Sequence, residues 1–167
     1  MPQLTTLGFL IKRNVQNQIS EICLGMKKTG FGQGKWNGFG GKVGDKLEFT
    51  GETIEESLQR EALEEFGIRI LEFKKVGFLH FIYQSTEKAV KEIDTYVFIV
   101  ENWSGNIAET EEMQPKWFKI NQIPFENMWI DDSHWMPRLL KEENFKARFI
   151  FQDNQLQEFE FLEPDLF

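Results

Sequence analysis

The sequence predicts an α+β fold, in which helices cover a central mixed sheet. Short strand-like runs are spread over the whole chain, one long helix signal interrupts them, and a short helix signal follows near residue 135. The 167 residues suffice for one hydrophobic core, and no repeat or linker divides them. We therefore expect a single domain over residues 1–167.

The N-terminal part predicts a strand pair followed by a loop. Residues 4–12 and 18–27 have the composition of strands, with turn residues at 14–17 between them. Residues 29–41 (TGFGQGKWNGFGG) then include six glycines, too many for a regular element. This segment predicts a loop whose backbone can approach a ligand closely.

The long helix is predicted over residues 53–66. Thr53 and Glu56 have the spacing of a capping box, and Gly67 is placed to end the helix. Between these ends, apolar residues recur every four positions at Leu58, Ala62 and Phe66. This spacing gives the helix one buried face.

The C-terminal half predicts further strands at residues 76–84, 93–100 and 116–120, and an irregular segment at 124–132. A short helix is predicted over 135–141, with Asp132 or Ser133 as N-cap and Pro137 in its first turn. Residues 147–152 and 157–162 predict a hairpin around Asp153 and Asn154.

Composition excludes several functional classes. A net charge of −8 argues against a sequence-independent grip on a nucleic acid polymer, which needs a basic surface. It is compatible with a small phosphorylated substrate, because a bound divalent cation can invert the local field. We find no apolar window long enough for a membrane span. The lone Cys23 fits a small core residue or a reactive thiol. We expect a soluble, cytoplasmic protein.

Three carboxylates mark the predicted helix. Glu61, Glu64 and Glu65 stand at positions i, i+3 and i+4 and share one narrow arc of the helix surface. Like charges this close repel one another, and a hard divalent cation such as Mg²⁺ is a common way to offset that repulsion. A solvated acidic face is the other interpretation, and the three glutamates taken alone favour it.

The surrounding motif resembles the signature of the Nudix (MutT) hydrolases. Glu52 is followed by seven residues and then by Arg60-Glu61-Ala62-Leu63-Glu64-Glu65-Phe66-Gly67-Ile68, after a Gly-Gly turn at Gly40-Gly41. The resemblance implies an α/β/α sandwich in which a loop–helix–loop segment binds divalent metal. It also implies that Glu61, Glu64 and Glu65 hold Mg²⁺ (or Mn²⁺) with help from the Gly40 carbonyl, while Arg60 orients them.

One segment departs from this pattern. The family's usual spacer between glycine and the first glutamate is five residues, whereas ten residues separate Gly41 from Glu52 here. The extra residues lie between Gly44 and Gly51. Long surface insertions cost little loop entropy, so a longer exposed loop is one interpretation and a lid over the substrate is the other.

Further blocks resemble one branch of the family, the mammalian MutT-type hydrolases of oxidised purine nucleoside triphosphates. These blocks are residues 25–42, 112–118, 123–135 and 149–152. The similarity implies hydrolysis of 8-oxo-dGTP, and of 2-oxo-dATP, to the monophosphate and pyrophosphate, which would remove oxidised precursors from the nucleotide pool. It also implies substrate contacts at Thr6 and Lys27 and a place for Glu112 near the metal.

Base recognition is predicted for Asn37, Asp131 and Asp132. Asn37 offers both a donor and an acceptor to a purine edge. Adjacent carboxylates in a desolvated pocket push one pKa upward, so one can donate while the other accepts. The alternative role of Asp131 and Asp132 is to cap the short helix.

Other predicted substrate contacts come from aromatic side chains and the glycine loop. Phe31, Phe81 and Trp129 could stack on or wall the base, with Ile93 on the far side, although Phe81 and Ile93 also suit the core. The loop contributes Phe39, Gly40, Gly41 and Lys42. A Nudix enzyme for another nucleoside diphosphate derivative and a non-catalytic nucleotide-binding module remain alternatives. We expect a monomer.

Overall fold

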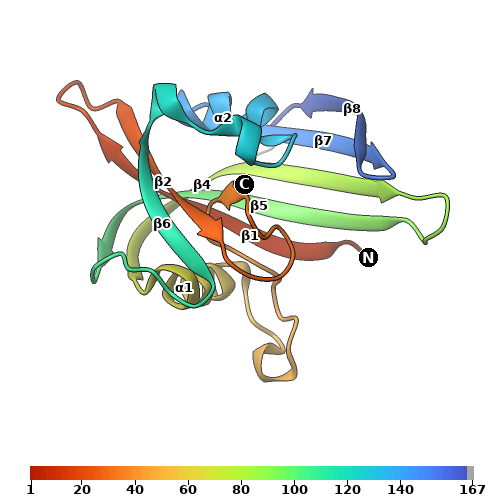
Figure 1. Ribbon diagram of the computed structural model, residues 1–167, viewed down its shortest axis with the longest axis horizontal. Coiled ribbons are helices and arrows are strands. Elements are labelled where there is room, and N and C mark those ends of the chain that lie inside the picture. Colours follow the sequence, from red (N-terminus) through yellow and green to blue (C-terminus); the bar gives the residue numbers. More distant parts are fainter. Residues whose placement is uncertain (165–167) are drawn as a thin grey trace.

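A computed structural model describes residues 1–164, and a mixed sheet runs through this part of the chain (Figure 1). Its strands are β1 (Gln3–Arg13), β2 (Ile19–Lys27), β3 (Trp36–Asn37), β4 (Arg69–Gln84), β5 (Lys91–Ser104), β6 (Met113–Lys119), β7 (Phe145–Gln152) and β8 (Gln155–Leu162). The order is β3-β2-β1-β5-β4-β7-β8, and β6 pairs with β2. The pairs β1–β5 and β4–β7 are parallel, and the other strand pairs are antiparallel.

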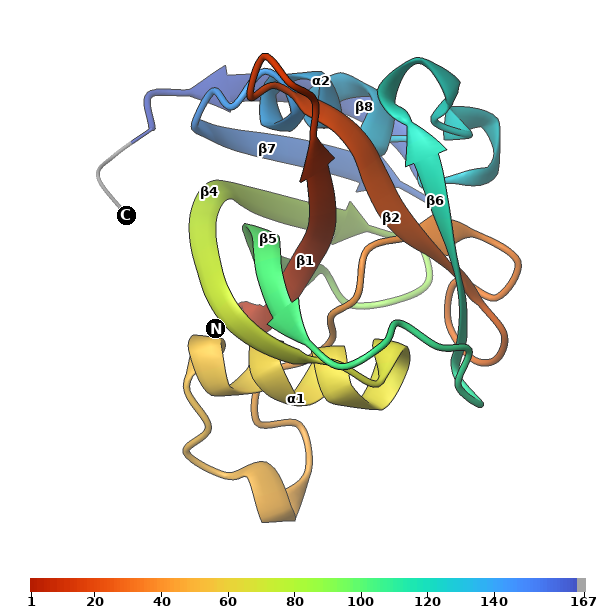
Figure 2. The ribbon, with the colours of Figure 1, turned by 90° about the vertical axis from the view of Figure 1, so that its left-hand side faces the viewer.

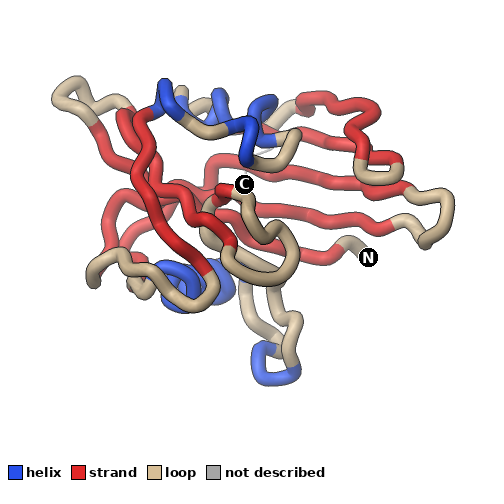
Figure 3. Tube along the Cα trace, in the orientation of Figure 1, coloured by secondary structure: helices blue, strands red, loops and turns tan. Residues whose placement is uncertain are grey.

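The helices α1 (Ile54–Phe66) and α2 (Asp132–Leu140) lie on opposite faces of the sheet (Figures 2 and 3). Strand β1 shows why, because successive side chains point to opposite faces. Phe9 and Ile11 belong to the core cluster that contains α2, whereas Leu10 belongs to the cluster under α1. The predicted α+β sandwich with a central mixed sheet is confirmed.

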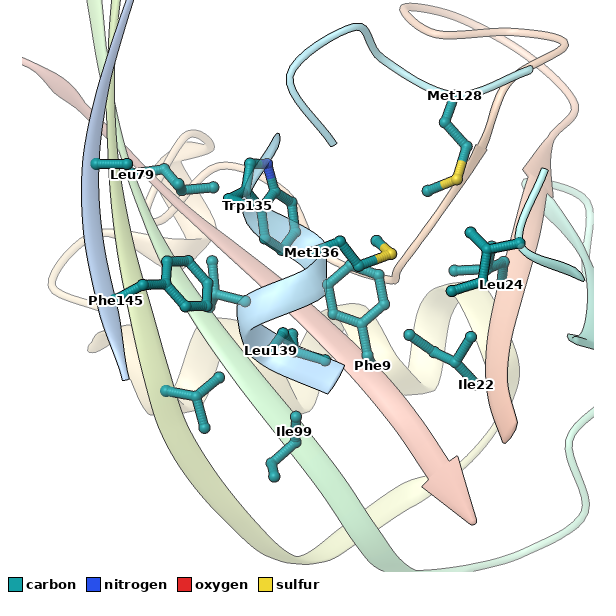
Figure 4. Packing of buried hydrophobic residues seen from close by; sticks show 14 of the residues in the cluster. Phe9, Ile22, Leu24, Leu79, Ile99, Met128, Trp135, Met136, Leu139 and Phe145 are labelled. Atoms are coloured by element: carbon teal, nitrogen blue, oxygen red, sulfur yellow. The ribbon is translucent and has the colours of Figure 1, made fainter. Parts of the chain in front are cut away.

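Helix α2 is held by aromatic packing (Figure 4). Trp135 is fully buried and stacks on Phe145, with ring centroids 5.5 Å apart, and its ring also meets Phe9 at 6.0 Å. Met136 and Leu139 complete the buried face of the helix. Burying a side chain of this size contributes roughly 1.5–3 kcal/mol, so this face anchors the segment that precedes the helix.

Helix α1 confirms the prediction at both ends. The Thr53 hydroxyl accepts the Glu56 N–H, and the Glu56 carboxylate accepts the Thr53 N–H, which completes the capping box. Gly67 ends the helix with φ 70°, a left-handed conformation that favours glycine. The predicted stripe of Leu58, Ala62 and Phe66 is fully buried.

The second helix differs from its prediction. It begins at Asp132, its N-cap is Asp131, and Asp131 makes no capping bond through its side chain. The predicted caps at Asp132 and Ser133 are therefore wrong, and Pro137 lies inside the helix rather than in its first turn. The cause is local, because the Asp132 carboxylate turns back to accept the Trp129 N–H and starts the helix earlier.

Two strands extend beyond their predicted limits. Strand β4 begins at Arg69 and β5 continues to Ser104, and their pairing contains register shifts between Ile70 and Gly77. Such irregularities bend a strand, and β4 curves strongly around the body in Figure 2. Because of the bend, residues 69–75 of β4 do not follow the regular alternation of apolar and polar residues that predicts a strand.

The glycine loop enters between β1 and β2 where these strands diverge. Its short strand β3 pairs with β2 at Gly25 and Met26, and further along it Phe39 and Lys42 bridge to β1. At Gly40, φ is +151°, and a Cβ atom there would collide with the backbone carbonyl of Thr6. Glycine is therefore required for the loop to reach α1.

Across residues 1–164, no helix is long and apolar enough to cross a membrane.

Candidate active site

Glu61, Glu64 and Glu65 differ in burial, although they share one face of α1. Glu65 is 1% exposed and Glu61 is 8% exposed, whereas the side chain of Glu64 is 35% exposed. The spacing of four residues explains the first two, because it places both beside the buried Leu58–Ala62–Phe66 stripe. The glycine loop covers this side of the helix, and Gly41 touches the Glu61 carboxylate so closely that a Cβ atom would collide with it.

Of the two carboxylate oxygens of Glu65, one accepts a hydrogen bond and the other accepts none. Its Oε1 accepts the Gly40 N–H at 2.9 Å, while its Oε2 is buried and has no hydrogen bond among residues 1–164. Lys27 Nζ lies 3.8 Å from that oxygen. Burial raises the pKa of Glu65 to about 8, against the opposing effects of the Gly40 N–H and the Lys27 charge. A buried carboxylate of this kind is stabilised by a cation.

Arg60 links the glutamates to the preceding loop. Its Nε donates to Glu52 Oε1 at 2.6 Å, and its Nη1 donates to Glu61 Oε1 at 2.9 Å and Glu64 Oε2 at 3.2 Å. The hydrogen bond from Arg60 holds the pKa of Glu52 below its usual value. Arg60 therefore orients three carboxylates with one planar group.

The donor set suits a hard divalent cation. Burial raises the pKa of Glu61, which Arg60 partly offsets, and the exposed Glu112 lies close enough for its charge to raise the pKa of both Glu61 and Glu65. Within the described residues, no three acidic, histidine or cysteine side chains are already arranged to hold an ion. Glu65 Oε1 accepts the Gly40 N–H, and Arg60 Nη1 donates to one oxygen of Glu61 and to one oxygen of Glu64.

A cavity of about 230 Å³ lies on the sheet face that carries α2. It is smaller than the roughly 300–1,000 Å³ of a typical pocket for a whole ligand, and suits a single base. Predicted residues that line it are Thr6, Lys27, Phe31, Asn37, Gly41, Phe81, Ile93, Trp129, Asp131 and Asp132. Because Lys27 and Gly41 also touch the glutamates, the cavity and the carboxylate helix are contiguous.

Aromatic rings form the mouth of the cavity. Phe31 stacks on Trp129 with centroids 5.0 Å apart and an angle of 27°, although Phe31 is 83% exposed. Lys35 Nζ lies over the Trp129 ring at 5.1 Å. Gly32 passes the same ring closely enough that a Cβ atom would meet it at 3.2 Å. The glycine loop therefore contacts the segment before α2 at the indole ring of Trp129.

Asp131 and Asp132 lie together at the cavity and are almost fully buried. Asp131 Oδ2 accepts the Trp135 Nε1–H at 2.9 Å, and Asp132 Oδ2 accepts the Trp129 N–H at 3.0 Å. Burial raises the pKa of both carboxyls, and the charge of Asp131 raises that of Asp132 further. The pair can therefore present one protonated and one ionised carboxyl.

Three predicted loop residues do not line the cavity. The Phe39 ring is fully buried between Gly8 and Phe66 on the α1 side, so this side chain serves the core. Lys42 is exposed, and its carbonyl accepts a bond from Arg60. Gly40 faces Glu65 through its N–H.

Sequence reasoning missed several cavity residues. Lys35 and Trp135 were not proposed, since nothing local indicates that they meet Trp129 and Asp131. Tyr83 was also missed, although it follows Phe81 by two positions on a strand and so shares its face. Burial and the charges of the Asp131–Asp132 pair raise the pKa of the Tyr83 phenol, which stays protonated.

Comparisons with known proteins agree with this geometry. The model of the NUDIX domain family matches residues 5–139. The oxidized purine nucleoside triphosphate hydrolase of Mus musculus is 44% identical over 136 residues, which cover 81% of this chain and 82% of the mouse protein. The protein of the same name from Danio rerio is 43% identical and covers 83% of this chain and 84% of its own length.

The fold is also found in a solved structure. The crystal structure of a MutT protein from Bacillus halodurans superposes with a TM-score of 0.78 and covers 98% of this chain and 99% of that protein. At 21% sequence identity, this likeness concerns the fold alone.

Proposed function

The chain belongs to the Nudix family of hydrolases, and from this premise we propose that it converts oxidised purine nucleoside triphosphates to the monophosphate and pyrophosphate. The main substrate is 8-oxo-dGTP, and 2-oxo-dATP is a second one. The biological role is to remove these precursors before a polymerase can use them. We further propose that residues 1–167 act as one domain, as a cytoplasmic monomer.

One observation carries the choice of substrate. The buried Asp131–Asp132 pair lies in an aromatic cavity that is contiguous with the carboxylate face of α1. A purine held there meets two carboxyls whose protonation states can exchange. Oxidation changes the pattern of donors and acceptors on a purine edge, and a site built around hydrogen bonds distinguishes such patterns strongly. Asn37, which also lines the cavity, supplies a further donor and acceptor.

The metal is proposed to be Mg²⁺, which Mn²⁺ can replace. Nudix hydrolases generally use divalent ions, and the carboxylate oxygens of Glu61, Glu64 and Glu65 are hard ligands. Glu112 and the Gly40 carbonyl are further proposed ligands. When bound, the ion neutralises phosphate charge and lowers the pKa of a coordinated water. The buried Glu65 Oε2 accepts no hydrogen bond within residues 1–164, which supports this assignment, because such an oxygen favours a cation at closer range than the Lys27 ammonium 3.8 Å away.

The chain's own residues position the substrate. Lys27 lies between the cavity and Glu65, where its ammonium group can meet the phosphates without leaving the site. The Thr6 hydroxyl is buried, lines the cavity and has no partner among residues 1–164, so it is available to a substrate. The proton of the attacking water passes to a carboxylate of the cluster, for which Glu61, Glu64, Glu65 and Glu112 are the candidates.

A panel of substrates tests this proposal. Pyrophosphate release is measured from 8-oxo-dGTP, 2-oxo-dATP, methylated purine triphosphates and the four normal deoxynucleotides, with Mg²⁺ and with EDTA. We expect kcat/KM for 8-oxo-dGTP to exceed that for dGTP by at least about tenfold, as one discriminating hydrogen bond gives. Equal rates for both nucleotides, or full activity in EDTA, would contradict it.

A further inference from the structure

The insertion between Gly44 and Gly51 projects from the body beside α1 (Figures 1 and 2). Among the described residues that line the cavity, none comes from this segment. It therefore does not act as a lid in this arrangement. Its contacts lie instead with Glu52 and Arg60.

The insertion has a defined internal structure. Residues Leu47–Phe49 form one turn of 3-10 helix, in which the Thr50 hydroxyl and the Thr50 N–H both donate to the Leu47 carbonyl. Leu47 at the tip is 93% exposed, whereas Phe49 is turned inward and partly buried. The turn thus presents one aromatic ring to the protein.

That ring meets the arginine of the site. The Arg60 Cζ atom lies 4.2 Å from the centroid of the Phe49 ring. The guanidinium donates to carboxylates in its own plane, so its flat face is free to stack on an aromatic ring at the same time. Phe49 can therefore fix the plane of Arg60 without taking a donor from Glu52, Glu61 or Glu64.

The insertion also forms hydrogen bonds with Glu52, the carboxylate that binds Arg60. The Gly44 N–H donates to Glu52 Oε2 at 3.0 Å, and the Glu52 N–H donates to the Phe49 carbonyl at 3.0 Å. Both members of the Glu52–Arg60 pair are thus tied to the same eight-residue segment, by hydrogen bonds on one side and by the ring on the other.

We propose that Phe49 is a positioning residue, which through Arg60 holds Glu61 and Glu64 in the orientation that takes the divalent ion. This role rests on the proposed metal site, and the insertion itself supplies no ligand to the ion. Glu52 holds the guanidinium through two hydrogen bonds, from Nε at 2.6 Å and from Nη2 at 3.1 Å, and without the ring this pair can tilt as a unit. Arg60 Nη1 then no longer holds Glu61 Oε1 and Glu64 Oε2 together.

The test measures ion binding directly. Binding of Mn²⁺ to the full chain without nucleotide is followed by the loss of the free-ion EPR signal, for the wild type and for Phe49→Ala, Phe49→Leu and Phe49→Tyr. We expect Phe49→Ala and Phe49→Leu to weaken Mn²⁺ binding about three- to tenfold, as loss of one cation–π contact predicts. Phe49→Tyr keeps the ring and should bind as the wild type does.

A matched control separates positioning from folding. Leu47→Ala changes the exposed tip of the same turn and should leave both Mn²⁺ binding and the thermal midpoint unchanged. If Phe49→Ala lowers the thermal midpoint but leaves Mn²⁺ affinity intact, or if Phe49→Leu binds as tightly as the wild type, the positioning role is wrong. If the wild-type chain binds no Mn²⁺ at all, the metal site of the proposed function is wrong as well.

Discussion

The indole N–H of Trp135 donates to Oδ2 of Asp131 at 2.9 Å, so a carboxyl at the cavity is bound to the central aromatic side chain of the α2 core. Trp135 is fully buried and stacks on Phe145. The carboxyl is therefore placed by the hydrophobic packing of a helix rather than by a mobile loop. The base recognition that we propose for Asp131 therefore rests on the packed core around α2.

Asp131→Asn tests the role of this carboxyl. The amide can still accept the Trp135 N–H, but it cannot exchange between protonated and ionised states. We expect kcat/KM for 8-oxo-dGTP to fall about 10- to 100-fold, the effect of losing a hydrogen bond to a charged group, with a smaller fall for dGTP. Steady-state kinetics on both nucleotides check this. Equal losses on the two substrates would instead indicate a structural role.

Glu64→Gln tests the carboxylate face of α1. Glu64 is the most exposed of the three glutamates, and its replacement removes no core contact. We expect the free energy of unfolding to change by less than about 0.5 kcal/mol, while kcat with Mg²⁺ falls at least about 100-fold. Glu55→Gln, on the exposed first turn of the same helix, is the matched control and should keep full turnover. Near-normal kcat in Glu64→Gln would refute the metal assignment.

The raised pKa of Glu65 predicts a pH-dependent stability in the absence of divalent ions. The folded state holds a proton with a pKa of about 8, whereas the unfolded carboxyl releases it near 4.5, so the folded state binds more protons between these values. The contribution of Glu65 to the free energy of unfolding is therefore complete below pH 4.5 and is lost as pH rises towards 8. Urea unfolding at several pH values, with EDTA present, measures the free energy of unfolding. Glu65→Gln should make this free energy depend less on pH between 4.5 and 8. An unchanged slope would show that Glu65 does not titrate in this range.

Gly41→Ala tests the close approach of the loop to α1. A Cβ atom at this position would collide with the Glu61 carboxylate. We expect the variant to fold, since the displaced group is a side chain at the edge of the core. Its half-activating Mg²⁺ concentration should rise about tenfold, because misplacing one ligand costs on the order of 1.4 kcal/mol. Unchanged Mg²⁺ activation would mean that Glu61 has room to move and that the contact is unimportant.

The sequence predicts those parts of the site whose determining residues lie close together in the chain. Helix α1 carries its cap, its stop and its apolar stripe within residues 53–67, so both its limits and its carboxylate face could be predicted. The hairpin of β7 and β8 was likewise marked by Asp153 and Asn154, which take φ values of 47° and 67°. The family motif then suggested what the carboxylates bind.

Long-range contacts escaped prediction for a physical reason. Whether Phe39 faces the base or the core depends on where the glycine loop crosses β1, and that is decided by a bridge to Gly8 some thirty residues earlier. Similarly, Lys35 meets Trp129 only because two distant segments converge. The start of α2 depended on a side-chain bond from Asp132 to Trp129 that competes with capping.

The order of the strands has a consequence for how the protein is made. Strand β1 pairs in parallel with β5, which joins Gln3 to Ile93 and Leu10 to Val100. While a ribosome is still synthesising the chain, this edge of β1 stays open until β5 (Lys91–Ser104) has emerged. An open edge is prone to pair with other chains. A nascent chain that ends before β5 is therefore the stage at which we expect chaperones to be needed, before the apolar stripe of α1 has a complete sheet to rest on.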